Sequence, residues 1–450
     1  MLLSLKTAIL ALQTKIFYRR MLLVYSQKIT TRLSYSFKHI FLRILGVDVS
    51  FTTVLEEFIA HEGPKMSYGK QPLGNEFFIQ EHGLLAENGI ESIEIQLKEW
   101  GSIPAFFPTI EKSSIPFDIF AASFYLLSRY EEYLPHVKDA KGRYPASESL
   151  AFQNKFLELP IVDMWAYKFK TILVQSFPEM KFPSKHMSLH NVLTVQRPFA
   201  YSQKGFFRSF LCYFQDLLRG RFKNNFYRTQ VLLGIRKDPY DTFTWIVNIA
   251  KRSASKMTTF FLLGENEEYQ DSLNTHRKSY QLLVKYVADY KEVGLLYSAS
   301  SLTRFEALQE EVKRMENTIN RKVLSAKQSN YFVNLPENYR NLIELEIEKD
   351  FTMAYHDTPG FRAGTCTPFL FYDLDFEIKT PLVLHPIALA STALDNEQPN
   401  IIEAKVQELL QRVRQVNGVF SVVLSNENFT SDDENTVWRK VFSETLQNYE

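Results

Sequence analysis

The runs Thr258-Thr-Phe-Phe-Leu-Leu263 and Val293-Gly-Leu-Leu-Tyr297 decide the fold of this chain. Both are short and apolar, and they are rich in the residue types that favour strands. Between them, residues 278–290 repeat apolar side chains at helical spacing. A strand, a helix and a second strand in this order predict a parallel pair joined by a crossover helix.

The same alternation extends from residue 190 to the end of the chain. Further strand-like runs lie at residues 192–195, 322–325, 352–355, 382–389 and 418–425. Helical patterns separate or follow them at residues 242–252, 302–318, 337–346, 401–416 and 434–447. Seven strands that alternate with helices predict an α/β fold with a parallel sheet, most simply a barrel. We therefore expect any chemistry at the carboxyl ends of these strands.

The first part of the chain mixes strands and helices with many turns. We expect strands at residues 22–25 and 77–80, an extended piece at 51–60, and helices at 31–45, 119–133 and 169–177. A proline-punctuated stretch around residues 177–186 then separates two halves. The predicted organisation is an N-terminal α/β (α+β) domain at residues 21–180 and a barrel at residues 188–450. Residues 1–20 are expected to be an extension outside the fold, and Met21 is a second plausible start.

Composition excludes several classes of protein. The 450 residues carry 52 Lys and Arg against 51 Asp and Glu, a net charge of +1 that argues against a nucleic-acid binder. Cys212 and Cys366 lie far apart, so a disulfide scaffold and a zinc ribbon are excluded and a cytoplasmic location is favoured. No run reaches the roughly 18 apolar residues of a membrane span, and we expect no signal peptide.

Several ungapped stretches carry a family resemblance. They include Ile115-Pro-Phe-Asp-Ile-Phe-Ala-Ala-Ser-Phe-Tyr, Lys237-Asp-Pro-Tyr-Asp-Thr-Phe, Leu335-Pro-Glu-Asn-Tyr-Arg, Gly360-Phe-Arg-Ala-Gly-Thr-Cys and Phe371-Tyr-Asp-Leu-Asp. With them the chain resembles a bacterial polysaccharide deacetylase of the two-domain type, which has an extra α/β domain before the deacetylase barrel. The resemblance covers nearly everything after Met21, and it implies a distorted (β/α)7 barrel.

The resemblance also implies a catalytic set that this chain lacks. Active relatives hold a divalent metal such as zinc with one Asp and two His, and they use a second Asp as base and a late His as acid. A bound cation lowers the pKa of water from ~15.7 to roughly 7, so loss of the ligands removes the nucleophile. Here the first strand is followed by no Asp between His190 and Cys212, and Leu296, Ser329 and Ser425 stand where the family has histidines. We therefore expect no metal, no cofactor and no catalytic residue of the family type.

The mouth of the predicted barrel is the candidate binding site. Its expected lining is Gln196, Leu296, Gln328, Ser329, Arg362, Ser425 and Glu427. Arg362 matches the family arginine that would orient the missing Asp, and a salt bridge to a structural carboxylate is its expected state, with anion binding as the alternative.

Two main hypotheses follow for function. The first is a degenerate deacetylase homologue that binds a glycan or a partner protein without hydrolysing it. The alternative is an active hydrolase of carbohydrate N-acetyl bonds, with a relocated site built from Gln328, His356, Arg362 and Glu427. A third class, a purely structural interaction protein, would bind no saccharide. The basic and aromatic segment at residues 204–237 suits an anionic saccharide or a partner protein, although a solvated amphipathic helix pair is its ordinary interpretation.

Overall fold

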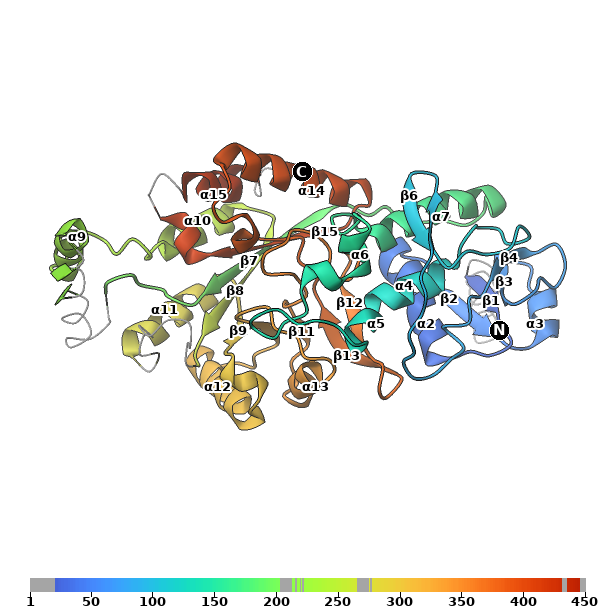
Figure 1. The fold of residues 1–450 in the computed structure, drawn as a ribbon, viewed down its shortest axis with the longest axis horizontal. Helices are drawn as coiled ribbons and strands as arrows, with labels where there is room; N and C mark the ends of the chain where they lie inside the picture. The colour runs from blue at the N-terminus through green and yellow to red at the C-terminus, as the bar shows by residue number, and fades with distance from the viewer. Residues whose placement is uncertain are drawn as a thin grey trace, which may run out of the picture.

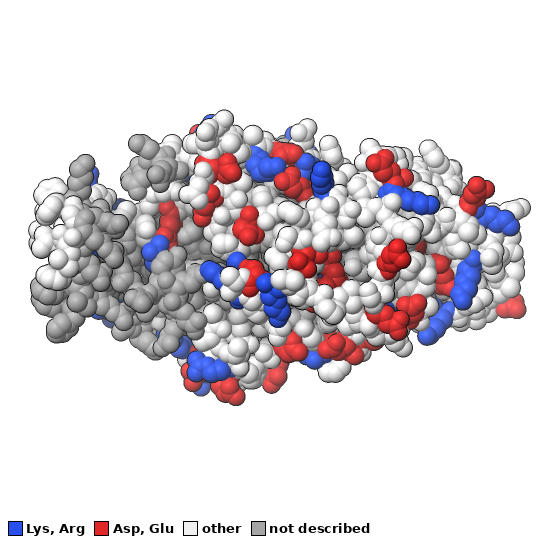
Figure 2. Space-filling model, in the orientation of Figure 1, with Lys and Arg blue, Asp and Glu red and all other residues white. Residues whose placement is uncertain are grey.

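The computed structural model describes residues 21–202, 213–214, 217–218, 220, 222–264, 275, 277–430 and 435–445. The predicted extension at residues 1–20 lies outside these ranges. None of the helices in the described part combines the length and apolarity that crossing a bilayer needs. Figure 2 shows Lys and Arg interspersed with Asp and Glu over the described part of one face.

The N-terminal half is built on a four-stranded parallel sheet in the order β2-β1-β3-β4. Its strands are β1 (Leu22–Tyr25), β2 (Val49–Thr52), β3 (Lys65–Gly69) and β4 (Phe77–Gln80). Helix α2 (Thr31–Lys38) continues as the π-helical segment η1 (His39–Leu45), and the two together connect β1 to β2. The predicted extended piece at residues 51–60 is wrong in part, because its second half is helix α3 (Leu55–Ala60).

The remainder of this half consists of a β-hairpin and further helices, of which α4 is buried along its whole length. Its elements are the hairpin of β5 (Leu97–Trp100) and β6 (Ile103–Phe106) and the helices α4 (Ile119–Leu127), α5 (Tyr130–Tyr133), α6 (Leu150–Gln153) and α7 (Ile161–Ser176). Asp118 caps α4, because its carboxylate accepts the N–H groups of Phe120 at 3.1 Å and Ala121 at 3.0 Å. The single helix predicted at residues 119–133 is broken at Arg129, whose φ of 54° is left-handed.

The C-terminal half is built on a nine-stranded sheet in the order β12-β13-β11-β10-β9-β8-β7-β15-β14. The strands are β7 (Ser188–Val195), β8 (Lys256–Leu262), β9 (Glu292–Tyr297), β10 (Ser325–Gln328), β11 (Lys349–Asp350), β12 (Phe369–Asp373), β13 (Ile378–Leu384), β14 (Leu389–Ala390) and β15 (Val419–Ser425). The pairings are parallel except for β12 with β13. The parallel sheet predicted from the alternating pattern is therefore present.

The helices that flank this sheet (Figure 1) are α10 (Phe243–Arg252), α11 (Lys278–Ala288), α12 (Phe305–Ile319), α13 (Glu337–Glu344), α14 (Pro399–Gln415) and α15 (Thr436–Lys440). Helix α9 (Phe222–Leu232) lies apart from the sheet, at the left end of the view. A second apolar cluster unites residues of several strands, among them Val192, Phe260, Leu296 and Val423. Residues from β7, β8, β9 and β15 thus share one buried face.

A closed (β/α)7 barrel is not confirmed, since the described strands form an open sheet with β12 and β14 at its edges. The predicted strand at residues 352–355 is absent. The Asp350 carboxylate accepts Thr352 N–H at 2.9 Å and Thr352 Oγ1 at 2.7 Å, which turns the chain out of the ladder after β11. The strands β11, β10, β9, β8, β7 and β15 are consecutive neighbours in this sheet. Residues 378–390 nevertheless contact the strands at both ends of this series, since β13 pairs with β11 and β14 pairs with β15.

Contacts between the two halves are polar as well as apolar. Arg32 of α2 forms a salt bridge with Glu377 in the β12–β13 hairpin. Asp163 of α7 accepts hydrogen bonds from Thr365 Oγ1 at 2.6 Å and from Cys366 N–H at 3.0 Å. A third polar contact between the halves joins Glu132 to Arg362.

Candidate functional site

A cavity of about 360 Å³ opens at the carboxyl ends of β7, β10 and β15. Most of its lining consists of uncharged hydroxyl and amide side chains. Examples are Thr194, Gln196, Ser329, Asn330, Thr392 and Ser425. We call this cavity the strand-end pocket. Its position is where a parallel α/β sheet places binding residues, because the loops that follow the strands meet there.

The strand-end pocket brings together four of the seven residues predicted to line it. These four are Gln196, Ser329, Ser425 and Glu427. His356, which belonged to the alternative relocated site, lines the same cavity. Leu296, Gln328 and Arg362 are not part of its lining, and each has a different place in the structure.

Leu296 is fully buried in the apolar cluster formed by the inner strands. Tyr331 and Val423 belong both to this cluster and to the lining of the strand-end pocket. Leu296 therefore packs within the core next to the pocket. A leucine at this position adds apolar packing and supplies no donor for a metal ion.

Gln328 is also fully buried, and its amide organises the turn after β10. Its Oε1 accepts the backbone N–H groups of Asn330 at 2.6 Å and Phe332 at 2.9 Å. These bonds satisfy two partly buried donors in an irregular segment. Gln328 thus positions Ser329 and Asn330, which reach the pocket, and it takes no direct part in the lining.

Arg362 lies at the junction of the two halves, where it forms a buried salt bridge with Glu132. Arg362 Nε and Nη2 contact the two carboxylate oxygens of Glu132 at 2.8 and 2.7 Å, and Nη1 donates to the Ala354 carbonyl at 3.1 Å. Arg129 Nε contacts Glu132 at 2.8 Å, and Arg129 Nη2 contacts Glu131 at 2.8 Å. We call these four residues the junction cluster. The salt bridge expected for Arg362 is therefore present, and its partner comes from the N-terminal half.

The opposite charges of the junction cluster stabilise one another, so Glu132 stays ionised. Burial by itself would raise the pKa of Glu132, but the guanidinium groups of Arg362 and Arg129 outweigh it and lower that pKa to about 2. Both donors of Arg362 that face Glu132 are occupied. Arg362 is consequently engaged in structure and cannot serve an anion in the strand-end pocket.

Glu427 is paired at the rim of the strand-end pocket. Arg197 forms a bidentate salt bridge with it, in which Nε lies 3.1 Å from Oε1 and Nη2 contacts Oε2. Both side chains are partly exposed, at 29% and 25%. Ser425 Oγ accepts Glu427 N–H at 3.2 Å, and Asn428 Oδ1 accepts Ser425 N–H at 2.7 Å. These bonds cap the helical turn that follows β15 and hold its side chains at the pocket.

The residues present do not fit the family's metal. Among the described residues, no three His, Cys, Asp or Glu side chains are grouped so that they could hold a metal ion. In the pocket lining, His356, Asp395 and Glu427 are the groups of these types. Glu427 is already neutralised by Arg197. We therefore derive no hydrolytic step through a metal ion at this site.

Sequence reasoning missed the aromatic part of the pocket. Tyr240 and Tyr331 line it, together with Asn330 and Asp395. Tyr240 lies in the quoted Lys237-Asp-Pro-Tyr stretch, so a signal for it existed in the resemblance.

Lys327 is buried beside the pocket, and its ammonium group lies 3.5 Å from the centroid of the Tyr331 ring. Burial lowers the pKa of Lys327 to about 7, against the opposing effect of Asp350. No pattern in the sequence around Lys327 indicates that this lysine is buried.

The basic and aromatic segment at residues 204–237 is described only in part. Lys204, Arg208, Arg219 and Arg221 lie outside the described residues. Of the remainder, Arg228 is buried and lies over the rings of Tyr201 and Tyr213, at 5.4 and 5.1 Å from their centroids. Phe222 and Phe226 on α9 are exposed. The proposed partner surface on this segment stays a prediction.

Residues 22–178 match DUF7033, a family of unknown function. The match covers about a third of the chain, including the four-stranded sheet. None of the curated proteins compared with the chain matches it.

Solved structures similar to the chain include two described as polysaccharide deacetylases and a CE4 family pseudoenzyme. A "putative polysaccharide deacetylase" from Mycobacterium smegmatis is 12% identical, with a TM-score of 0.37 over 59% of this chain and 86% of that one. A "probable polysaccharide deacetylase" from Pseudomonas aeruginosa PAO1 is 10% identical, with a TM-score of 0.35 over 57% and 84%. A CE4 family pseudoenzyme from Bacillus anthracis is 12% identical, with a TM-score of 0.28 over 59% and 63%. At these TM-scores no residue role and no activity is transferred to this chain.

Proposed function

We propose that this chain is a non-hydrolytic homologue of polysaccharide deacetylases that binds a saccharide in the strand-end pocket. The observation that carries the proposal is the chemistry of the lining, which is dominated by hydroxyl and amide groups with two tyrosines. Neutral sugars present hydroxyl groups that need such partners, and they present flat C–H faces that pack on aromatic rings. An N-acetylated sugar adds an amide, which the pocket's Asn and Gln side chains match.

The lining of the strand-end pocket also supports a protein that does not hydrolyse its ligand. Amide hydrolysis at neutral pH needs an activated water and a proton donor for the leaving amine. Gln196, Ser329 and Ser425 offer hydrogen bonds, and none of them exchanges a proton near pH 7. His356, Asp395 and Glu427 also line the pocket, but among the described residues no group of three such side chains could hold the metal ion that would activate the water. The proposal extends to the finer fold, a distorted deacetylase-type barrel, supported by the contact of residues 378–390 with both β11 and β15.

A cytoplasmic location belongs to the same proposal. Cys366 is free and fully buried. A reduced cysteine in the core is compatible with a reducing compartment.

The direct test is calorimetric binding of N-acetylglucosamine oligomers to the full chain. Asn330 lines the pocket, and no hydrogen bond from its side-chain amide is found among the described residues, so Asn330→Ala removes a ligand contact without breaking the fold. We expect three- to tenfold weaker binding, which is the worth of one hydrogen bond. The matched control is Asn88→Ala at an exposed position of the N-terminal half, which should bind normally.

Two outcomes would overturn the proposal. One is that no oligomer binds, or that Asn330→Ala and Asn88→Ala bind equally well. The other is release of acetate from the oligomers on addition of zinc or cobalt, since that result would support the alternative of an active deacetylase with a relocated site.

A further inference from the structure

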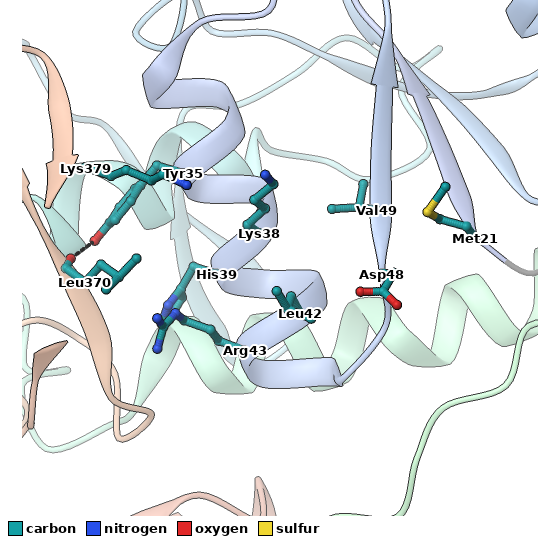
Figure 3. Close-up of a pocket in the computed structure, with 10 residues that line it drawn as sticks. All are labelled: Met21, Tyr35, Lys38, His39, Leu42, Arg43, Asp48, Val49, Leu370 and Lys379. Carbon is teal, nitrogen blue, oxygen red and sulfur yellow. Dashed lines mark hydrogen bonds between the residues drawn. The ribbon is translucent and has the colours of Figure 1, made fainter. Parts of the chain in front are cut away.

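A second cavity, separate from the strand-end pocket, lies between the two halves. It measures about 490 Å³ and shares no lining residue with the strand-end pocket. Figure 3 shows that its residues come from three places: Lys38, His39, Leu42 and Arg43 from α2 and η1, Leu370 and Lys379 from β12 and β13, and Met21, Asp48 and Val49 from the start of the first sheet. We call this cavity the interdomain groove.

The charged groups of the interdomain groove are predominantly basic. Lys38, Arg43 and Lys379 line it, and Asp48 is its single carboxylate. Among the described residues, none of these four side chains forms a salt bridge. Arg43 makes only a long contact of 3.4 Å from Nη1 to the Pro368 carbonyl. Three cations around one concave surface produce a positive potential, which attracts an anion.

His39 gives the second and independent observation. Its side chain lines the groove and is only 2% exposed, yet neither ring nitrogen has a hydrogen-bond partner. Buried polar groups in proteins are almost always satisfied, and an orphaned one costs stability. Burial, with smaller effects of Arg43 and Lys185, lowers the pKa of His39 to about 3, so the ring is neutral at pH 7. A neutral imidazole can donate one hydrogen bond and accept another.

The rest of the lining is apolar. Leu42, Val49 and Leu370 form much of the wall, and Leu42 is 48% exposed. The Tyr35 hydroxyl cannot donate to a ligand, because its proton is donated to the Leu370 carbonyl at 2.7 Å (Figure 3). This bond instead ties α2 to β12 and fixes the width of the groove at that side.

We propose that the interdomain groove binds a small organic anion, a phosphate or carboxylate group carried on a short apolar chain. The anionic group would lie among Lys38, Arg43 and Lys379 and offer a hydrogen-bond partner to His39. The apolar chain would cover Leu42 and Val49. A ligand of this kind satisfies the unpaired cations, the orphaned imidazole and the apolar wall together.

The test measures binding of four probes to the full chain by calorimetry: hexyl phosphate, inorganic phosphate, 1-hexanol, and vesicles that contain phosphatidic acid. We expect hexyl phosphate to bind at least tenfold more tightly than inorganic phosphate, and 1-hexanol not to bind. Vesicle binding that hexyl phosphate competes away would assign the anion to a lipid headgroup. Hexyl phosphate binding without vesicle binding would assign it to a soluble molecule.

Variants separate the site from a general effect of charge. Lys379→Gln, at an exposed position of the groove, should weaken hexyl phosphate binding five- to tenfold. Lys313→Gln removes the same charge from an exposed position on α12 and should have no effect. Equal binding of hexyl phosphate and 1-hexanol, or equal loss in the two lysine variants, would overturn the proposal.

His39→Leu gives a readout that a purely structural role would not move. Because the orphaned imidazole is replaced by an apolar group, the ligand-free protein should melt at a higher temperature while its affinity for hexyl phosphate falls. Imidazole nitrogen resonances of His39 should also shift when hexyl phosphate is added to the unsubstituted protein. A variant that melts lower and binds normally would contradict a role for His39 in the site. Binding of N-acetylglucosamine oligomers should be unchanged throughout, so this proposal can fail independently of the proposed function.

Discussion

The junction cluster and the strand-end pocket use polar side chains in opposite ways. In the junction cluster, Arg129, Glu131, Glu132 and Arg362 are buried and joined by salt bridges. In the strand-end pocket, hydroxyl and amide groups face an open cavity, and the Arg197–Glu427 pair lies at a half-exposed rim. Charges are thus concentrated where the halves meet, and uncharged groups where a ligand would enter.

This difference accounts for the state of Arg362. The sequence predicts a salt bridge from Arg362 to a structural carboxylate, and the structure provides it. The partner is Glu132, 230 positions earlier in the chain, so the pair joins the two halves.

The strongest test of the comparison is Glu132→Gln. The substitution leaves Arg362 and Arg129 buried without their shared carboxylate. Removal of one partner from a buried ion pair costs about 3–5 kcal/mol, so we expect a loss of that size in the free energy of unfolding. Urea denaturation would measure it. A loss below about 1 kcal/mol would show that the junction cluster is no more important than a surface pair.

The pH dependence of that loss sharpens the same point. The pKa of Glu132 is lowered from an ordinary value of 4.5 to about 2, so its stabilising effect is complete above about pH 4.5 and is lost as the pH falls towards 2. The difference in unfolding free energy between the unsubstituted protein and Glu132→Gln should be constant from pH 7 to 5 and smaller at pH 3. Asp118 and Asp350, whose pKa values burial raises to about 6, affect both proteins alike and cancel in the difference. A difference that grows at low pH would contradict the assignment.

Arg362→Met should have an intermediate effect. Glu132 keeps its contact with Arg129, so no buried carboxylate is left unpaired, although the Ala354 carbonyl loses its donor. We expect a loss of about 1–3 kcal/mol, the cost of leaving buried polar groups unsatisfied. If the loss equalled that of Glu132→Gln, Arg129 would contribute nothing to holding the Glu132 charge.

The smallest effect is expected for Glu427→Gln at the rim of the strand-end pocket. Its pair with Arg197 is partly exposed, and such pairs contribute about 0–1 kcal/mol. Thermal and urea unfolding should change by no more than this amount. A cost equal to that of Glu132→Gln would remove the distinction between the two regions.

The hydrophobic pattern of the sequence predicted the positions of those strands that are apolar. The run at residues 258–263 lies in β8 apart from Leu263, and the run at 293–297 lies in β9. The pattern at residues 242–252 is α10 apart from its first residue. The strand expected at residues 322–325 is instead β10, Ser325–Gln328. Lys327 and Gln328 are buried polar residues, so hydropathy placed the strand too early.

Tertiary contacts decide the remainder. Arg129 takes a left-handed φ inside an apolar helical pattern because its guanidinium is held by Glu131 and Glu132. Asp350 turns the chain where a β-rich run predicts a strand. For the site, strand order brings Gln196, Ser329 and Ser425 to one cavity. Burial of Leu296 and the distant partner of Arg362 have no local signal in the sequence.

The salt bridge between Glu132 and Arg362 also bears on inheritance of the two halves. A gene fragment that encodes residues from 188 onward would deliver an arginine whose neutralising carboxylate was left behind on the other fragment. Recombination that exchanged one half for that of a distant homologue would create the same mismatch unless the incoming piece carried an acid at the equivalent place. The two halves should therefore be passed on as one unit and co-evolve across this contact.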